Sequence, residues 1–354
     1  MKKISLLLAI LLALGIALLP GTRVFAQAPV KLKFSNFFPA THQYAILGQQ
    51  FCDEIKKRTN GKVEIAYYPS GILTTAPKMF EGVVNGVSDL GLSHCEYTRG
   101  RFPVTETLSL PMGYPSGYVA GQIANDFYNQ FHAKEWDAAH VLLFYSTGPQ
   151  IISTVKKPVK TLEDLKGLKI RATGRPADIL KAVGGTPVGV EMADMYDGLQ
   201  RGVVDGVLSS MEVQKGWKIG EIIRYATLSY KVGTVYTFYI VMNKNKWNAL
   251  PEDAKKIFTD VAAQWKDKYG VASNDIDIEG REYLLKNGGQ LIPLSDEESK
   301  RWVSAAQPVV EKHIKELEAK GHKRAELEAY VKFISERIPV WTKKEKELKI
   351  ASPY

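Results

Sequence analysis

The sequence predicts an α/β protein built from two similar lobes, and two observations carry this prediction. Strand-like and helix-like segments alternate along the chain, which is typical of parallel sheets covered by helices on both faces. Residues 79–93 (MFEGVVNGVSDLGLS) also match residues 195–209 (MYDGLQRGVVDGVLS) at seven of fifteen positions without a gap. Any two helix–turn–strand units share some features, but this many identities favours one equivalent unit in each lobe, ending at Ser93 and Ser209.

The first half of the chain supplies the elements of one lobe. Apolar residues alternate with polar ones in the strands, whereas Tyr44, Leu47, Phe51 and Ile55 recur at helical spacing. The expected segments are strand 31–35, a helix ended by Asn60-Gly61, strand 63–67, helix 76–85, strand 89–93 and strand 141–145.

The pattern restarts after Pro158, where Thr161 and Asp164 form a helix-starting cap. Beyond Pro251 the chain becomes mostly helical, and Ser295 and Glu298 form a second capping box. The expected segments are strand 168–172, helix 177–183, strand 186–190, helix 193–201, strand 204–209, strand 234–242 and a short strand near 291.

Length, composition and charge fit a two-domain globular protein. The chain has 354 residues, 45 % of them apolar, which suffices for real cores. The net charge of +9 is spread along helix faces rather than gathered in a patch. Solvated helix surfaces explain this better than nucleic-acid binding, so we expect no nucleic-acid partner, although a mild positive field favours anionic ligands.

Residues 1–26 have the pattern of a secretory signal peptide. Lys2 and Lys3 precede an uncharged apolar run over 4–19, and Val24-Phe25-Ala26 fits the cleavage rule. The alternative is an uncleaved membrane anchor, but the apolar run is short for one. No lipobox cysteine follows and no later stretch is apolar enough to span a bilayer. We therefore expect a soluble periplasmic protein after cleavage.

The sequence does not suggest an enzyme or a metalloprotein. It lacks the Walker, GxGxxG, GxSxG and HExxH motifs, and its histidines and cysteines have no ligand spacing. Ser93 and His94 are adjacent but do not form a catalytic relay. Cys52 and Cys95 permit a disulfide in an exported protein, which the sequence leaves open. We expect no cofactor and no metal.

Arg171 is the residue with the clearest binding chemistry. It lies in the short strand 168–172 between Gly167 and Gly174. A guanidinium is a planar fork that matches a carboxylate, and ligands of α/β sheets bind at strand ends. An ordinary surface salt bridge is an equally good explanation from these residues alone.

Several motifs give a family resemblance. They are PVKTLEDLKGLKIR at 158–171, GGTPV at 184–188, MYDGLQRGVVDG at 195–206, PATH at 39–42, TNGKV at 59–63 and WNALP at 247–251. With them the chain resembles the periplasmic solute-binding subunits of tripartite ATP-independent periplasmic (TRAP) transporters of the DctP type. The resemblance covers nearly the whole mature chain.

This resemblance implies a periplasmic binding protein fold with two α/β lobes, hinge strands and a long helix spanning both. The implied division is residues 27–148 plus 238–276 for one lobe, and 149–237 plus 277–354 for the other with the C-terminal helices. It also implies that there is no cofactor and that Arg171 holds a ligand carboxylate.

Two departures from sialic-acid-binding members concern specificity, since Gln150 replaces a second arginine and Ser209 an asparagine. Aromatic residues near strand ends hint at an acid with an apolar or aromatic body. The expected aromatic contacts are Phe37, Phe38, Tyr97, Trp217, Tyr236 and Phe238. The expected polar contacts are Ser93, His94, Gln150, Ser209, Ser210 and Glu212, where Glu212 meets a ligand amine or merely pairs with Lys215.

The predicted function is capture of a small organic acid and its delivery to a membrane permease. The lobes close on the ligand and exclude water, which strengthens the pair with Arg171. One alternative is a periplasmic sensing module that uses the same cleft without transport. A periplasmic enzyme of unfamiliar type is the second alternative.

Overall fold

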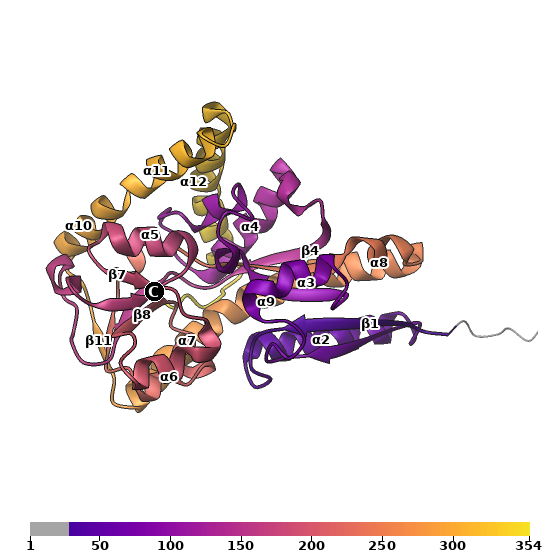
Figure 1. Ribbon diagram of the computed structural model, residues 1–354, viewed down its shortest axis with the longest axis horizontal. Coiled ribbons are helices and arrows are strands. Elements are labelled where there is room, and N and C mark those ends of the chain that lie inside the picture. The colour runs from indigo at the N-terminus through magenta and orange to yellow at the C-terminus, as the bar shows by residue number, and fades with distance from the viewer. Residues whose placement is uncertain (1–27) are drawn as a thin grey trace, which may run out of the picture.

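A computed structural model describes residues 28–354 of the protein. The predicted signal peptide at 1–26 lies outside the described residues. Two sheets organise the chain, and we call the parts around them lobe I and lobe II (Figure 1). The predicted residue boundaries of the lobes stay a prediction.

The sheet of lobe I has five strands in the order β2-β1-β3-β10-β4. β1, β2 and β3 are parallel, and both partners of β10 run antiparallel to it. The strands are β1 (Val30–Asn36), β2 (Val63–Tyr68), β3 (Leu90–His94), β4 (Ala139–Ser146) and β10 (Thr237–Asn243).

The sheet of lobe II has six strands in the order β11-β9-β5-β8-β6-β7. β6, β7 and β8 are parallel, whereas β5 is antiparallel to both of its neighbours. The strands are β5 (Ile151–Thr154), β6 (Lys169–Arg171), β7 (Thr186–Val188), β8 (Gly206–Ser209), β9 (Tyr225–Thr227) and β11 (Gln290–Ile292).

The expectation of parallel sheets was therefore wrong for β5 and β10, which run antiparallel to their neighbours. β5 and β10 each follow a passage of the chain from the other lobe, at residues 147–150 and 228–236. A strand that enters a lobe from the cleft starts where the parallel strands end, and so it runs in the opposite direction. The pairing of Phe238 with His94 and of Ile151 with Ser209 shows this arrangement.

Helices cover the sheets, and the 35-residue α9 (Glu252–Lys286) contacts both lobes. It packs on α2, α4 and β4 in lobe I and on α7 and β11 in lobe II, which confirms the predicted spanning helix. In lobe I the helices are α2 (Gln43–Arg58), α3 (Met79–Val84), α4 (Gly117–Phe131) and α8 (Lys244–Ala249). In lobe II they are α5 (Gly174–Ala182), α6 (Met195–Gln200) and α7 (Val213–Gly216).

The C-terminal helices run along one side of the molecule (Figure 1). They are α10 (Asp296–Ala306), α11 (Pro308–Glu318) and α12 (Arg324–Glu347). α10 and α11 pack on α5, whereas α12 packs on α4 of lobe I. The predicted cap of α10 is present, because the Glu298 amide donates to the Ser295 hydroxyl at 3.1 Å. No helix within residues 28–354 combines the length and apolarity needed to cross a membrane.

The repeated sequence units form equivalent structures in the two lobes. Each is a helix, a turn and a strand, namely α3–β3 and α6–β8. Asp89 accepts a hydrogen bond from the Lys33 amide at 2.7 Å, and Asp205 accepts one from the Lys169 amide at 2.8 Å. The shared aspartate thus ties each unit to the adjacent parallel strand of its sheet, β1 in lobe I and β6 in lobe II.

Candidate functional site

A small cavity lies between the lobes, at the carboxyl ends of the parallel strands. Its lining residues come from the ends of β1, β3, β6 and β8, from the start of β10, from both interlobe passages, from the turn after β7, and from α7 and the residues that flank it. They are Phe37, Phe38, His94, Thr147, Arg171, Met192, Ser209, Glu212, Val213, Trp217, Tyr236 and Phe238. All except the half-buried Trp217 are buried. The cavity of about 10 Å³ has room for one water molecule, so a larger ligand can enter only when the lobes move apart.

Arg171, the last residue of β6, is 1 % exposed. Its Nε donates to the Val190 carbonyl at 2.9 Å, and its Nη2 donates to the Tyr97 hydroxyl at 3.3 Å. The guanidinium carbon lies 5.8 Å from the ring centroids of both Tyr97 and Tyr236. Neutral groups thus orient the guanidinium, but within residues 28–354 no carboxylate forms an ion pair with it.

Arg175 shows what a structurally neutralised arginine looks like in the same protein. It is 2 % exposed, and its Nε donates to Glu106 at 2.9 Å. Its Nη1 also pairs with Asp178 and Glu316. A buried charge without a counter-charge is unfavourable, so the two arginines have different roles. Arg171 has the environment of a residue that receives an anionic ligand.

Aromatic rings form most of the apolar wall beside Arg171. Phe37 stacks with Trp217 at a centroid distance of 6.1 Å and with Phe238 at 6.3 Å. The ring planes of Phe37 and Phe238 are only 9° apart. Phe38 stacks on Phe37 at 4.3 Å. Parallel rings of this kind create flat apolar surfaces, which suit a flat apolar ligand body.

His94 contributes a polar group without adding a second positive charge. Its Nδ1 lies 3.0 Å from Glu96 Oε2, and its ring lies 3.9 Å from the Tyr97 ring. Burial, and secondarily the charge of Arg171, holds the pKa of His94 well below its usual value. Burial also raises the pKa of Glu96 to about 7. The imidazole is therefore neutral near pH 7.

Glu212 closes the other side of the cavity. Its Oε2 lies 2.9 Å from His42 Nε2, a contact between lobe II and lobe I. Its amide donates to Asp277 of α9 at 2.8 Å. Lys215 pairs instead with Glu279 at 2.7 Å, so the expected alternative pairing of Glu212 with Lys215 was wrong.

Most of the sequence-predicted site residues come together around this cavity. Those that line it are Phe37, Phe38, His94, Arg171, Ser209, Glu212, Trp217, Tyr236 and Phe238. Tyr97 does not line the cavity but contacts two residues that do. Its hydroxyl accepts from Arg171 Nη2 and, at 3.1 Å, from the Met192 amide. Ser210 is buried, and its hydroxyl has no hydrogen-bond partner within residues 28–354.

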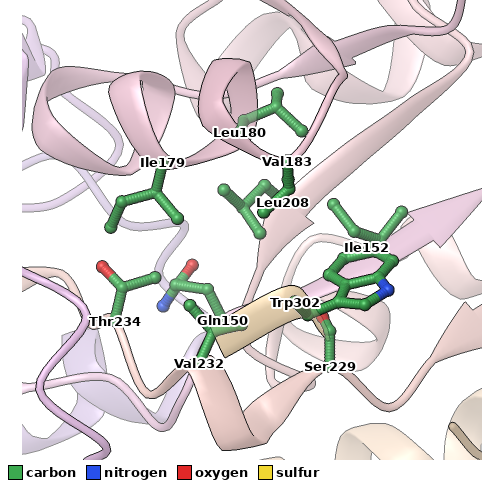
Figure 2. Close-up of a pocket in the computed structure, with 10 residues that line it drawn as sticks. All are labelled: Gln150, Ile152, Ile179, Leu180, Val183, Leu208, Ser229, Val232, Thr234 and Trp302. Carbon is green, nitrogen blue, oxygen red and sulfur yellow. The ribbon is translucent and has the colours of Figure 1, made fainter. Parts of the chain in front are cut away.

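Ser93 and Gln150 lie elsewhere. Ser93 precedes His94 in β3, and successive side chains of a strand face opposite sides of the sheet. Its hydroxyl donates to the Ala76 carbonyl at 2.8 Å, away from the cavity. Gln150 lines a separate cavity inside lobe II (Figure 2). Its neighbours there are Ile152, Ile179, Leu180, Val183, Leu208, Ser229, Val232, Thr234 and Trp302.

Sequence reasoning missed Thr147, Met192 and Val213, which also line the cavity. Thr147 lies on the passage from β4 to β5, three residues before Gln150, which the family resemblance had marked as a specificity position. The chain leaves one lobe at this point and enters the other, so the residue at the passage was a recognisable candidate.

Comparison with known proteins identifies the family. The sequence model of bacterial extracellular solute-binding protein family 7, DctP, matches residues 34–317. The 2,3-diketo-L-gulonate-binding periplasmic protein YiaO of Escherichia coli is 26 % identical over 256 residues, which cover 71 % of this chain and 77 % of YiaO.

Two solved structures show the same fold. A TRAP periplasmic solute-binding protein from Desulfovibrio salexigens is 33 % identical with a TM-score of 0.76, and the match covers 88 % of this chain and 96 % of that one. A TRAP solute-binding protein from Rhodoferax ferrireducens, in complex with copurified benzoate, is 25 % identical with a TM-score of 0.83, covering 88 % and 99 %. These proteins are solute-binding proteins and not enzymes. The chain therefore belongs to the DctP family of TRAP-type extracellular solute-binding proteins.

Proposed function

We propose that this protein captures a monocarboxylic acid with an apolar or aromatic body and delivers it to a TRAP membrane permease. The observation that carries the proposal is the buried guanidinium of Arg171, which faces the interlobe cavity without a carboxylate partner among the described residues. A ligand carboxylate would supply the missing negative charge.

The charges around the cavity favour one carboxylate over two. Arg171 is the one arginine or lysine among the residues lining the cavity within 28–354. On the other side, Glu212 would repel a second carboxylate at short range. A dicarboxylate would therefore leave one charge unpaired in a dry site.

The rest of the lining favours a flat apolar body. The stacked rings of Phe37, Trp217 and Phe238 offer little to the hydroxyl groups of a sugar acid. The benzoate found in the Rhodoferax ferrireducens protein supports the same class of ligand, because that protein shares the fold over 88 % of this chain.

Membership of the family supports delivery to a permease, and the residue pattern of 1–26 supports export through a signal peptide. The competing role is ligand sensing with the same cleft. Deletion of the gene separates the two roles. Loss of high-affinity benzoate uptake supports delivery, whereas unchanged uptake with a lost transcriptional or chemotactic response supports sensing.

Calorimetric titration tests the ligand class directly. The purified protein is unfolded and refolded to remove retained ligand, then titrated with benzoate, mandelate, succinate and glucuronate. We expect the two aromatic monocarboxylates to bind more tightly than the other two acids. Tighter binding of succinate or glucuronate would contradict the aromatic monocarboxylate proposal.

Arg171→Ala tests the anchor. Loss of a buried ion pair should weaken binding by roughly 2–5 kcal/mol, and Arg171→Lys should weaken it less because the charge remains without the fork. Arg201→Ala is the matched control, since Arg201 is exposed and is not among the residues that line the cavity. Unchanged affinity in a folded Arg171→Ala protein would remove this residue from the site.

A further inference from the structure

We infer that Thr147 is a second anchor for the ligand's carboxylate, and that Gln150 holds its hydroxyl in the orientation of a donor. The inference rests on the proposed function, because it concerns how the same cavity binds an acid. It assigns a role to two residues that lie on the passage between the lobes.

Thr147 shares the cavity with Arg171. It is the first residue after β4, is 2 % exposed, and lines the cavity together with Arg171 and Tyr236. A hydroxyl group there can reach a ligand that the guanidinium also contacts.

The hydrogen bonds of Thr147 determine what its hydroxyl can do. A threonine hydroxyl has one donor hydrogen and two acceptor lone pairs. Gln150 Nε2 donates to Thr147 Oγ1 at 2.8 Å, and the Tyr236 amide donates to the same oxygen at 3.2 Å. Both acceptor positions are therefore occupied. Within residues 28–354 the hydroxyl hydrogen has no acceptor, so it is free to donate into the cavity.

The orientation of Gln150 is fixed by a second contact. Its Nε2 also donates to the Gly148 carbonyl at 3.1 Å, and an amide oxygen in that place would repel the carbonyl. The amide oxygen of Gln150 is buried in the lobe II cavity without a hydrogen-bond partner among the described residues. Figure 2 shows Gln150 beside Thr234. The backbone N–H of Gln150 donates to the backbone carbonyl of Thr234 at 2.9 Å. Gln150 thus acts on the ligand through Thr147, as a positioning residue.

The backbone holds the donor in place before a ligand arrives. The Thr147 amide donates to the Tyr236 carbonyl at 3.1 Å, while the Tyr236 amide donates to Thr147 Oγ1. These reciprocal bonds tie the two interlobe passages together. A donor that is already oriented stabilises a charged acceptor without further ordering of the site.

The arrangement also defines a chemical preference. Arg171 and Thr147 would both present hydrogen-bond donors to the same group, and a carboxylate can accept from both. The NH₂ group of a carboxamide would meet a donor at one of these positions. The pair therefore selects acids over their amides.

The test uses benzoate as the probe and calorimetry on the refolded protein. Thr147→Val keeps the shape of the side chain but removes the hydroxyl, and should raise the Kd for benzoate roughly 10- to 100-fold. Thr147→Ser keeps the hydroxyl and should stay within about threefold of wild type. Thr227→Val is the control, because its buried hydroxyl donates to the Val159 carbonyl, away from the cavity.

The positioning role of Gln150 needs a readout at the carboxylate itself. The carbon-13 shift of bound carboxyl-labelled benzoate reports hydrogen bonds to that group. We expect this carbon-13 shift to differ from its wild-type value in Thr147→Val and in Gln150→Leu. It should equal the wild-type value in Thr147→Ser and in Thr227→Val.

The outcomes separate this inference from the proposed function. Wild-type affinity and an unchanged carboxyl shift in Thr147→Val, together with lost binding in Arg171→Ala, would overturn the Thr147 anchor and leave the proposed function intact. Absence of binding of both benzoate and mandelate by the refolded wild-type protein would overturn both. Circular dichroism melting curves confirm that each variant is folded.

Discussion

His42 of lobe I and Glu212 of lobe II are joined across the cleft, with Nε2 and Oε2 2.9 Å apart. His42 Nδ1 accepts from the Tyr44 amide at 3.2 Å, which places the ring hydrogen on Nε2 and makes it the donor to Glu212. Both side chains are nearly fully buried, at 1 % and 4 % exposure. The pair therefore exists in this form only when the lobes are together.

We predict that this pair stabilises the closed, ligand-bound form. A double-mutant cycle with His42→Ala and Glu212→Ala should give a coupling of roughly 1–3 kcal/mol in benzoate binding, measured by calorimetry. The exposed pair Lys215 and Glu279 is the matched control and should give coupling near zero. A similar coupling for both pairs would show that the buried contact has no special role in closure.

Gly148 is predicted to tolerate no side chain. A Cβ atom there would lie 1.8 Å from Asp277 Oδ2, so α9 and the interlobe passage would have to separate. Gly148→Ala should lower the free energy of unfolding by roughly 1–3 kcal/mol in urea denaturation. Gly189→Ala, where a Cβ would meet nothing within 4 Å, should change it by less than about 0.5 kcal/mol. Equal effects of the two substitutions would contradict this explanation.

His313 should make the protein less stable in acid. Burial, and secondarily the charge of Arg175, lowers its pKa to about 3, and its Nε2 lies 3.0 Å from Thr107 Oγ1. The unfolded chain binds a proton here near pH 6.5 and the folded protein does not, so stability falls as the pH drops below 6.5.

Between pH 6.5 and 5, the free energy of unfolding should fall by about 2 kcal/mol more in the wild type than in His313→Gln. Urea denaturation at several pH values measures this difference. His132→Asn, at an exposed position, should keep the wild-type pH dependence. Parallel pH profiles for the wild type and His313→Gln would refute the prediction.

Both cysteines are predicted to be protected thiols. Cys52 in α2 and Cys95 after β3 are buried and free, and burial raises the pKa of each thiol. An aromatic disulfide reagent at pH 8 should therefore titrate no thiol in the native protein and two after unfolding without reductant. Cys52→Ala should leave one. Failure to detect thiols after unfolding would indicate a disulfide instead.

The sequence was informative where function depends on a strand end. Arg171 ends β6, Phe37 directly follows β1 and Phe238 lies at the start of β10, and the apolar or alternating pattern of each strand locates these positions. The repeated units were equally visible, because Asp89 and Asp205 have the same structural task and so keep the same spacing.

Strand direction and side-chain facing could not be predicted in the same way. Nothing local distinguishes a strand that enters from the cleft, so β5 was not predicted, and the predicted strand 234–242, which is β10, was not recognised as antiparallel. Ser93 was assigned to the wrong face because β3 extends one residue further, to His94. Gln150 lies on a passage without periodicity, where its contacts depend on segments far away in the chain.

The position of β10 between β3 and β4 also constrains how the protein is made. Residues 90–94 and 139–146 can complete their sheet only after residues 237–243 have arrived, and α12 near the C-terminus covers α4. A chain that emerges N-terminus first therefore cannot finish its first lobe early. Non-local pairings of this kind form slowly, which favours the proposed export, because a chain that has not yet folded can cross a membrane.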